Sequence, residues 1–91
     1  MDELIPVDAD ALRAWMVRYI TAILDLPEDV ATGQAFNEYG FDSVEAVVMA
    51  GVMEEEFGVP IDPIRLFEHP SIDRFSVAMT GGVAAAVGGP A

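Results

Sequence analysis

The chain has 91 residues, which is enough for one compact domain and too few for two. Sixteen acidic residues face four arginines and no lysine, so the formal net charge at pH 7 is -12. This charge excludes nucleic-acid binding, which depends on lysine and arginine at phosphates, and disfavours anionic membranes. It favours partner proteins that present basic surfaces.

The apolar residues, 53% of the chain, are interspersed with charges, and no run reaches the roughly 18 to 20 apolar residues that span a bilayer. The N-terminus begins with acidic residues and lacks the basic and apolar regions of a secretory signal. The chain has no cysteine, so disulfides, thiolate metal ligands and cysteine nucleophiles are excluded. These features predict a soluble, cytoplasmic protein.

The first helix is predicted over residues 9–24 by apolar residues that recur at three- and four-residue spacing. Asp8 or Asp10 is placed to cap its first turn, and Pro27 lies beyond its end. Residues 1–8 show no such pattern and are predicted to be a flexible lead-in. The apolar face of the helix comprises Leu12, Trp15, Met16, Tyr19, Ile20, Ile23 and Leu24.

Residues 25–42 form a connection long enough to predict that its apolar members pack against the helices. The candidate anchors are the aromatic residues Phe36, Tyr39 and Phe41.

The second helix is predicted to begin at Asp42 or Ser43 and to end at Phe57, because Gly58 is a favourable C-terminal stop. The helix carries two apolar stripes, more than one contact with the core requires. One stripe comprises Val47, Ala50, Met53 and Phe57, and the other comprises Val44, Val48, Gly51 and Glu55.

A short third helix is predicted through about Phe67, because Asp62 is a favourable N-cap and Pro63 a favourable first residue. Pro70 ends this helix. Ser71 is placed to cap the last helix, whose apolar side comprises Ile72, Phe75, Val77 or Ala78, and Met79.

The glycines at positions 81 and 82 end the last helical pattern, and residues 81–91 are predicted to be a disordered tail or a linker stub. No alternating strand pattern competes with the helical ones. The prediction is therefore an all-α four-helix bundle with three longer helices, one short third helix and a long loop between the first two.

Two segments resemble those of acyl carrier proteins. Residues 40–44, Gly-Phe-Asp-Ser-Val, resemble the Gly-x-Asp-Ser-Leu signature of that family, with valine where leucine is commoner. Residues 66–71, Leu-Phe-Glu-His-Pro-Ser, follow at the family's spacing and are similar to the Leu-Phe-Asp-His-Pro-Thr of polyketide synthase carriers. The resemblance implies a carrier domain over residues 9–80 with the acyl carrier protein fold.

The resemblance implies that Ser43 carries a covalent 4′-phosphopantetheine arm, transferred from coenzyme A by a phosphopantetheinyl transferase that recognises Asp42. A serine that opens a helix after a loop is accessible to a modifying enzyme, and a phosphodiester there meets the positive end of the helix dipole. The protein would then be a non-catalytic carrier of acyl thioesters in polyketide or fatty-acid biosynthesis, without a metal. The Asp-Ser pair alone is also an ordinary helix cap.

The second helix would provide the recognition surface for an acyl-loading ligase or acyltransferase and for a ketosynthase or tailoring enzymes. A smooth apolar stripe framed by acids fits such partners, and the carrier itself is expected to be a monomer. In this stripe, valine stands where fatty-acid carriers commonly have glutamate, and a glycine lies in mid-helix. The predicted surface comprises Val44, Glu45, Val48, Gly51, Glu54 and Glu55.

Carriers of this family shelter the acyl group between the second and third helices. The residues predicted to line that pocket are also ordinary core candidates. They are Val47, Met53, Ile61, Ile64 and Leu66.

Three other interpretations compete with an acyl carrier. Peptidyl carriers usually have Gly-Gly-His-Ser or Gly-Gly-Asp-Ser at the modified serine, whereas this chain has the bulky Phe41. An acidic helical interaction module would dock basic partners without being modified. His69 and Asp73 have the spacing of an acyltransferase motif, but the chain is too short for a deep substrate channel, so His69 is expected to pack or cap between the third and fourth helices.

Overall fold

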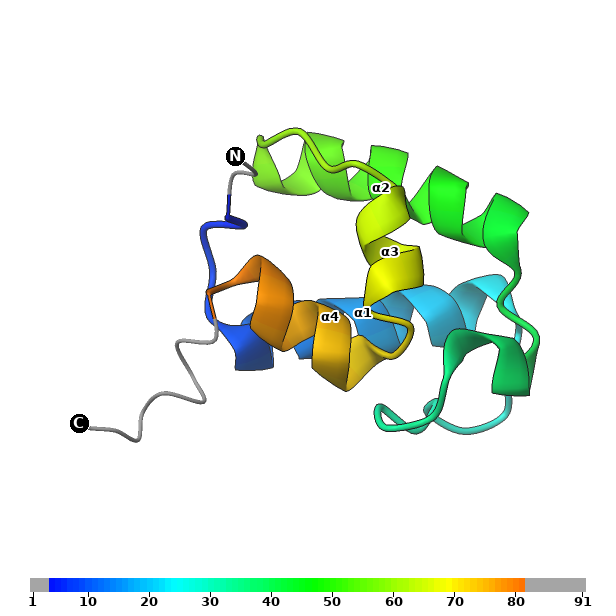
Figure 1. Cartoon of the computed structure of the whole chain (residues 1–91). Coiled ribbons are helices and arrows are strands. Elements are labelled where there is room, and N and C mark those ends of the chain that lie inside the picture. The colour runs from blue at the N-terminus through cyan, green and yellow to red at the C-terminus, as the bar shows by residue number, and fades with distance from the viewer. Residues whose placement is uncertain (1–3, 82–91) are drawn as a thin grey trace.

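The computed structural model describes residues 4–81, which form four α-helices and a 3-10 turn (Figure 1). Strand pairing among these residues is limited to one isolated bridge, between Ala35 and Ser71. The predicted all-α fold is therefore confirmed. The elements are α1 (Ala9–Ile23), η1 (Phe36–Tyr39), α2 (Ser43–Phe57), α3 (Ile64–Glu68) and α4 (Ile72–Met79).

Figure 1 shows α1 and α4 packed side by side, with α2 along the opposite side of the molecule and the short α3 between them. Each of the four helices contributes fully buried apolar side chains to one core, in which burial stabilises the fold. The largest of these are Leu12, Met16, Ile20, Met49, Met53, Leu66, Ile72 and Phe75. No helix among residues 4–81 is long and apolar enough to cross a membrane.

Side-chain caps begin three of the helices, as the sequence predicted. Asp8 accepts a hydrogen bond from the backbone N–H of Ala11 at 2.8 Å, and Ser71 accepts one from Arg74 at 3.2 Å. The cap of α2 belongs to the site described below. Each of these bonds satisfies a backbone donor that has no partner within its helix, so local sequence determines where the helices begin.

Local residues also set the limits of α3 and α1. The predicted N-cap of α3, Asp62, was wrong by one residue, because the N-cap is Pro63, which has no side-chain cap hydrogen bond. Asp62 instead accepts a hydrogen bond from the N–H of Ile64 at 3.0 Å. α1 ends at Ile23, before Pro27, because Asp25 adopts a left-handed conformation with φ of 55°.

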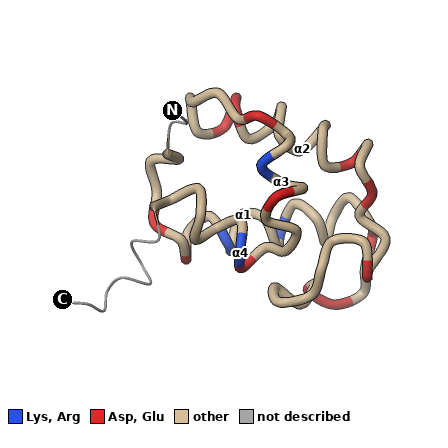
Figure 2. The backbone as a smooth tube through the Cα atoms, viewed as in Figure 1, with Lys and Arg blue, Asp and Glu red and all other residues tan. Residues whose placement is uncertain are grey.

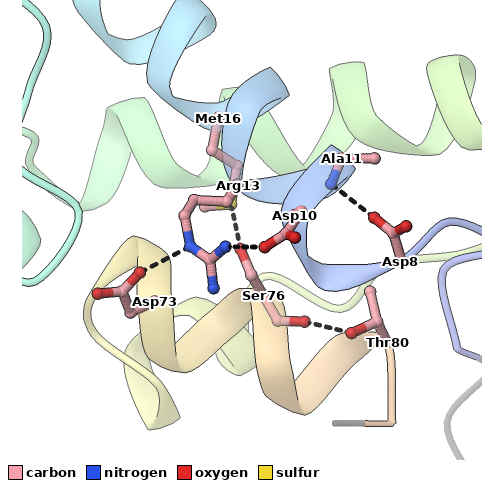
Figure 3. Close-up of polar contacts among 8 residues, drawn as sticks. All are labelled: Asp8, Asp10, Ala11, Arg13, Met16, Asp73, Ser76 and Thr80. Carbon is pink, nitrogen blue, oxygen red and sulfur yellow. Dashed lines mark hydrogen bonds and ion pairs between the residues drawn. The ribbon is translucent and has the colours of Figure 1, made fainter. Parts of the chain in front are cut away.

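Figure 3 shows the polar contacts between α1 and α4. Arg13 lies between two carboxylates, with its Nε 2.8 Å from Asp73 and its Nη1 2.5 Å from Asp10. The hydrogen bond to Asp73 is the main reason why the pKa of Arg13 is raised. Deeper in the interface, the buried Ser76 hydroxyl lies 3.8 Å from the sulfur of Met16, a polar core contact that the apolar pattern did not predict.

The predicted flexible lead-in, residues 1–8, contains a residue of the packed core. Ile5 is buried, and its backbone N–H donates to the carbonyl of Met79 at 2.8 Å. This contact ties the segment before α1 to the end of α4. Helical periodicity cannot detect a single apolar residue that packs from an extended segment. The predicted tail lies outside the described residues from position 82 onward.

Backbone hydrogen bonds hold the long loop between α1 and α2 against the rest of the molecule. The N–H of Phe36 donates to the carbonyl of Pro70 at 2.9 Å, and the N–H of Asp73 donates to the carbonyl of Thr32 at 3.0 Å. Phe36 and Phe41 are buried, as predicted for loop anchors. The loop therefore places the start of α2 next to the junction between α3 and α4.

Candidate functional site

Ser43 is the first residue of α2 and is exposed to solvent. The preceding Asp42 is the N-cap residue, and its Oδ1 accepts a hydrogen bond from the N–H of Glu45 at 2.9 Å. Before it, Phe41 is buried and its N–H donates to the carbonyl of Phe36 at 3.1 Å. A buried anchor and a helix cap therefore hold Ser43 in place while its hydroxyl stays accessible.

Gly40 allows the chain to turn into this site. It ends η1 with φ of 89°, a left-handed conformation that residues with a side chain rarely adopt. The turn η1 was not predicted from the sequence. Its local signal is Glu38, whose carboxylate accepts a hydrogen bond from the N–H of Ala35 at 3.1 Å.

A cavity of about 430 Å³ lies beside Ser43. Its walls come from the long loop, the first turns of α2, and α3 with the proline that follows. Most of the lining is aromatic or aliphatic, and the polar side chains are those of Asn37, Asp42 and Ser43. The full lining comprises Ala35, Phe36, Asn37, Phe41, Asp42, Ser43, Ala46, Leu66, Phe67 and Pro70.

This arrangement fits a covalent phosphopantetheine arm. The exposed serine hydroxyl can receive a phosphate at the positive end of α2, where the helix dipole stabilises negative charge. The adjoining cavity offers apolar surface beside the attachment atom. The protein can therefore provide both an anchor and a contact surface for such a group.

The cavity shares only Leu66 with the five residues predicted to line an acyl pocket. Met53 and Ile61 are buried core residues, whereas Val47 and Ile64 are half exposed. As a core candidate Val47 was wrong, because α2 turns other positions toward the core. The buried residues of α2 are Ala46, Met49, Ala50 and Met53.

The remaining cavity residues were missed because contacts between distant segments bring them together. Phe36 and Pro70 are far apart in the sequence, yet the backbone hydrogen bond between them closes the loop onto the end of α3. The carrier-like segment 66–71 contains two of the missed residues, Phe67 and Pro70, and was the part of the sequence that could have indicated them.

The exposed face of α2 is mostly apolar. Val44 is 69% exposed, and Val48 and Val52 are also exposed. Gly51 is exposed as well, and a Cβ atom built there would meet nothing within 4 Å. No contact within the described part of the molecule therefore explains a glycine that destabilises the helix by about 1 kcal/mol relative to alanine.

The predicted acidic frame of α2 divides into two groups. Glu54 and Glu55 are both exposed, and Oε2 of Glu54 also accepts a hydrogen bond from the N–H of Ile61 at 2.8 Å. Glu45 is half-buried, and after burial it is the second cause of the raised pKa of Tyr19. Figure 2 shows acidic positions along α2 and the long loop.

His69 is the C-cap residue of α3, and its N–H donates to the carbonyl of Arg65 at 3.0 Å. It therefore caps at the junction of α3 and α4, as expected. Asp73, the other member of the motif considered above, pairs with Arg13.

Tyr39 has a buried hydroxyl that finds no hydrogen-bond partner among the described residues. Its ring packs edge-on against Phe36, a wall of the cavity, with ring centroids 6.4 Å apart. Burial raises the pKa of Tyr39 to about 12. Removal of the hydroxyl should therefore change how the stability of the protein depends on pH.

We expect Tyr39→Phe to leave the free energy of unfolding unchanged or to raise it by up to about 1 kcal/mol at pH 7, since a buried, unpaired hydroxyl is lost. Above the unfolded pKa of about 10, the unfolded state releases the tyrosine proton while the folded state retains it. The wild type should therefore lose more stability than the variant between about pH 10 and 12. Urea denaturation across this range measures the difference, and parallel pH profiles would contradict it.

The phosphopantetheine attachment site family matches residues 14–76. Over 63 residues the chain is 35% identical to a phenolphthiocerol/phthiocerol polyketide synthase from Mycobacterium tuberculosis and 35% identical to polyketide synthase PksL of Bacillus subtilis. Both alignments cover 68% of this chain, which spans only 3% and 1% of the length of these relatives.

The fold is similar to that in the crystal structure of a free-standing peptidyl carrier protein from Acinetobacter baumannii. The TM-score is 0.75 at 22% sequence identity, and the match covers 84% of this chain and 96% of the other. At this identity the likeness demonstrates a shared carrier protein fold. The family match extends over most of the chain, and the chain therefore belongs to the phosphopantetheine attachment site family, whose carrier domains hold a covalently attached 4′-phosphopantetheine.

Proposed function

We propose that this protein is an acyl carrier that holds acyl groups on a phosphopantetheine arm attached to Oγ of Ser43. The observation that carries the proposal is the placement of this serine. It is exposed at the first position of α2, behind the N-cap Asp42, and it lines an apolar cavity. When bound, the arm supplies a terminal thiol that forms a thioester with the acyl group.

Attachment requires a phosphopantetheinyl transferase with coenzyme A as donor. Oγ of Ser43 forms a bond to the phosphorus that bears pantetheine, and the bond from that phosphorus to the nucleotide phosphate oxygen breaks. The transferase takes up the serine proton, and the nucleotide leaves as the bisphosphate. Asp42 holds the attacking residue at the helix start through its bond to the N–H of Glu45 and presents an exposed carboxylate for recognition.

An acyl rather than a peptidyl cargo is supported by the residues around the serine and by the synthase relatives. Phe41 stands where peptidyl carriers usually have glycine, and its ring is buried against Phe36 with centroids 5.5 Å apart. The two curated relatives described above are polyketide synthases. The partners proposed on this basis are a loading ligase or acyltransferase and a ketosynthase or tailoring enzymes.

The exposed face of α2 is proposed as the surface that these partners bind. Val44, Val48 and Gly51 form its apolar part, next to the serine and without large side chains that would hold a partner away. Glu55 adds negative charge at the far end of the helix. A complementary partner surface would be apolar with basic residues at its edge.

Incubation with coenzyme A and a broad-specificity phosphopantetheinyl transferase, followed by intact-mass measurement, tests the proposal. The wild type should gain the mass of one phosphopantetheinyl group, and Ser43→Ala should gain nothing. Ser43 is exposed, so the variant should keep its stability within about 0.5 kcal/mol. Ser76→Ala is the matched control and should be modified like the wild type, because its hydroxyl is buried.

A folded wild type without a mass gain would contradict the proposal and would favour the unmodified interaction module, which the exposed valines of α2 could also serve. A mass gain that persists in Ser43→Ala would assign the arm to another residue.

A further inference from the structure

The position of the cavity beside Ser43 restricts which part of an attached arm can enter the cavity. Ser43 is itself part of the lining, so the cavity adjoins the attachment atom. We infer that this cavity binds the dimethyl-bearing segment of the phosphopantetheine arm, next to the phosphate, and so directs the rest of the arm. The inference rests on the proposed attachment at Ser43.

The chemistry of the arm supports this assignment. After the phosphate come a methylene group and a quaternary carbon with two methyl groups, followed by a hydroxyl-bearing carbon and the first amide. The thiol, with any acyl group, lies at the far end. A cavity that adjoins the serine is therefore within reach of the methyl groups when the arm is extended, whereas the acyl group would enter only if the arm folded back.

The lining of the cavity is complementary to that segment. Its volume of about 430 Å³ lies within the range of about 300–1,000 Å³ typical of small-molecule sites. Phe36, Phe41 and Leu66 are buried and form fixed apolar walls suited to methyl groups. Asn37 is exposed at the same cavity and offers an amide that can bond to the hydroxyl or the first amide of the arm.

Phe67 distinguishes this site from the pocket predicted between α2 and α3. Phe67 and Ile64 lie on α3 with similar exposure, 50% and 48% of their surfaces. Only Phe67 lines the cavity beside Ser43, whereas Ile64 belongs to the pocket predicted from the sequence. Two half-exposed apolar residues on one short helix therefore form a matched pair for a test.

The experiment attaches an unlabelled arm to protein labelled with ¹³C and ¹⁵N and records isotope-filtered NOE spectra. We expect NOEs from the two arm methyl groups to the rings of Phe36 and Phe67. We also expect the amide signals of Asn37, Ala46 and Leu66 to shift between the apo and holo forms. Phe67→Ala should reduce these shifts at least twofold, while Phe67→Leu and Ile64→Ala should largely retain them.

Two results would overturn this inference alone: a protein that gains the arm but shows no methyl NOEs to these rings, or an equal loss of shifts in Ile64→Ala and Phe67→Ala. Far-UV circular dichroism and amide spectra of each apo variant verify that it is folded, and Phe67→Leu provides the comparison if Phe67→Ala unfolds. A folded protein that gains no mass would instead overturn the proposed function, and this inference with it.

Discussion

Phe41→Ala should lower the free energy of unfolding by about 3–5 kcal/mol, the usual result of truncating a buried phenylalanine. Phe41 is 2% exposed, packs against the ring of Phe36 and lines the cavity beside Ser43. Domains of this size are commonly stable by only about 5–15 kcal/mol, so the loss is a large share of the total. Because Phe41 anchors the chain directly before Asp42 and Ser43, the variant should also be modified more slowly by the transferase.

Urea denaturation of the apo protein, monitored by circular dichroism, measures this loss. Phe67→Ala is the matched control, since its ring lines the same cavity but is half exposed, and it should lose only about 1 kcal/mol. Equal losses in the two variants would show that Phe41 does not anchor the loop as its burial indicates.

Glu54→Ala should lower the free energy of unfolding by about 1.5–3 kcal/mol, the range for hydrogen bonds to charged groups. The carboxylate of Glu54 accepts the N–H of Ile61 at 2.8 Å, a partly buried bond that ties the end of α2 to the segment before α3. Ile61 is buried, so an alanine at position 54 would leave its backbone donor without this acceptor.

Glu54→Gln should retain most of the stability, because the amide oxygen can accept the same hydrogen bond. Glu55→Ala is the control on the next residue, which is exposed like Glu54, and it should change stability by less than about 0.5 kcal/mol. If Glu54→Ala kept full stability and weakened only the binding of a partner enzyme, Glu54 would have the recognition role predicted from the sequence.

The helices of this protein could be predicted from the sequence because their signals are local. Asp8, Asp42 and Ser71 cap their helices through hydrogen bonds to residues three positions ahead, and Gly58 ends α2 with φ of 74°. The family could be recognised for a related reason, since the Asp-Ser pair lies between a long loop and a helix with a Leu-Phe-Glu-His-Pro segment downstream. In each case a few neighbouring residues hold the information.

Residues whose roles depend on distant segments could not be assigned in this way. Glu54 has the pattern of a solvated acid, yet the chain returns past it and places the N–H of Ile61 against its carboxylate. Val47 has the spacing of a core residue, but the other packed elements meet α2 at Ala46 and Met49. Periodicity gives the width of an apolar face and not the direction from which its neighbours approach.

The helices, the side-chain caps of three of them and the serine that opens α2 could be read from the sequence alone, because each depends on contacts between residues a few positions apart. The hydrogen bond of Glu54 to Ile61 and the surroundings of Ser43 follow instead from how distant segments pack together. The cavity exists because Phe36 and Pro70, far apart in the chain, are joined by a backbone hydrogen bond of 2.9 Å. Such closure depends on the packing of the whole domain, which no local pattern specifies.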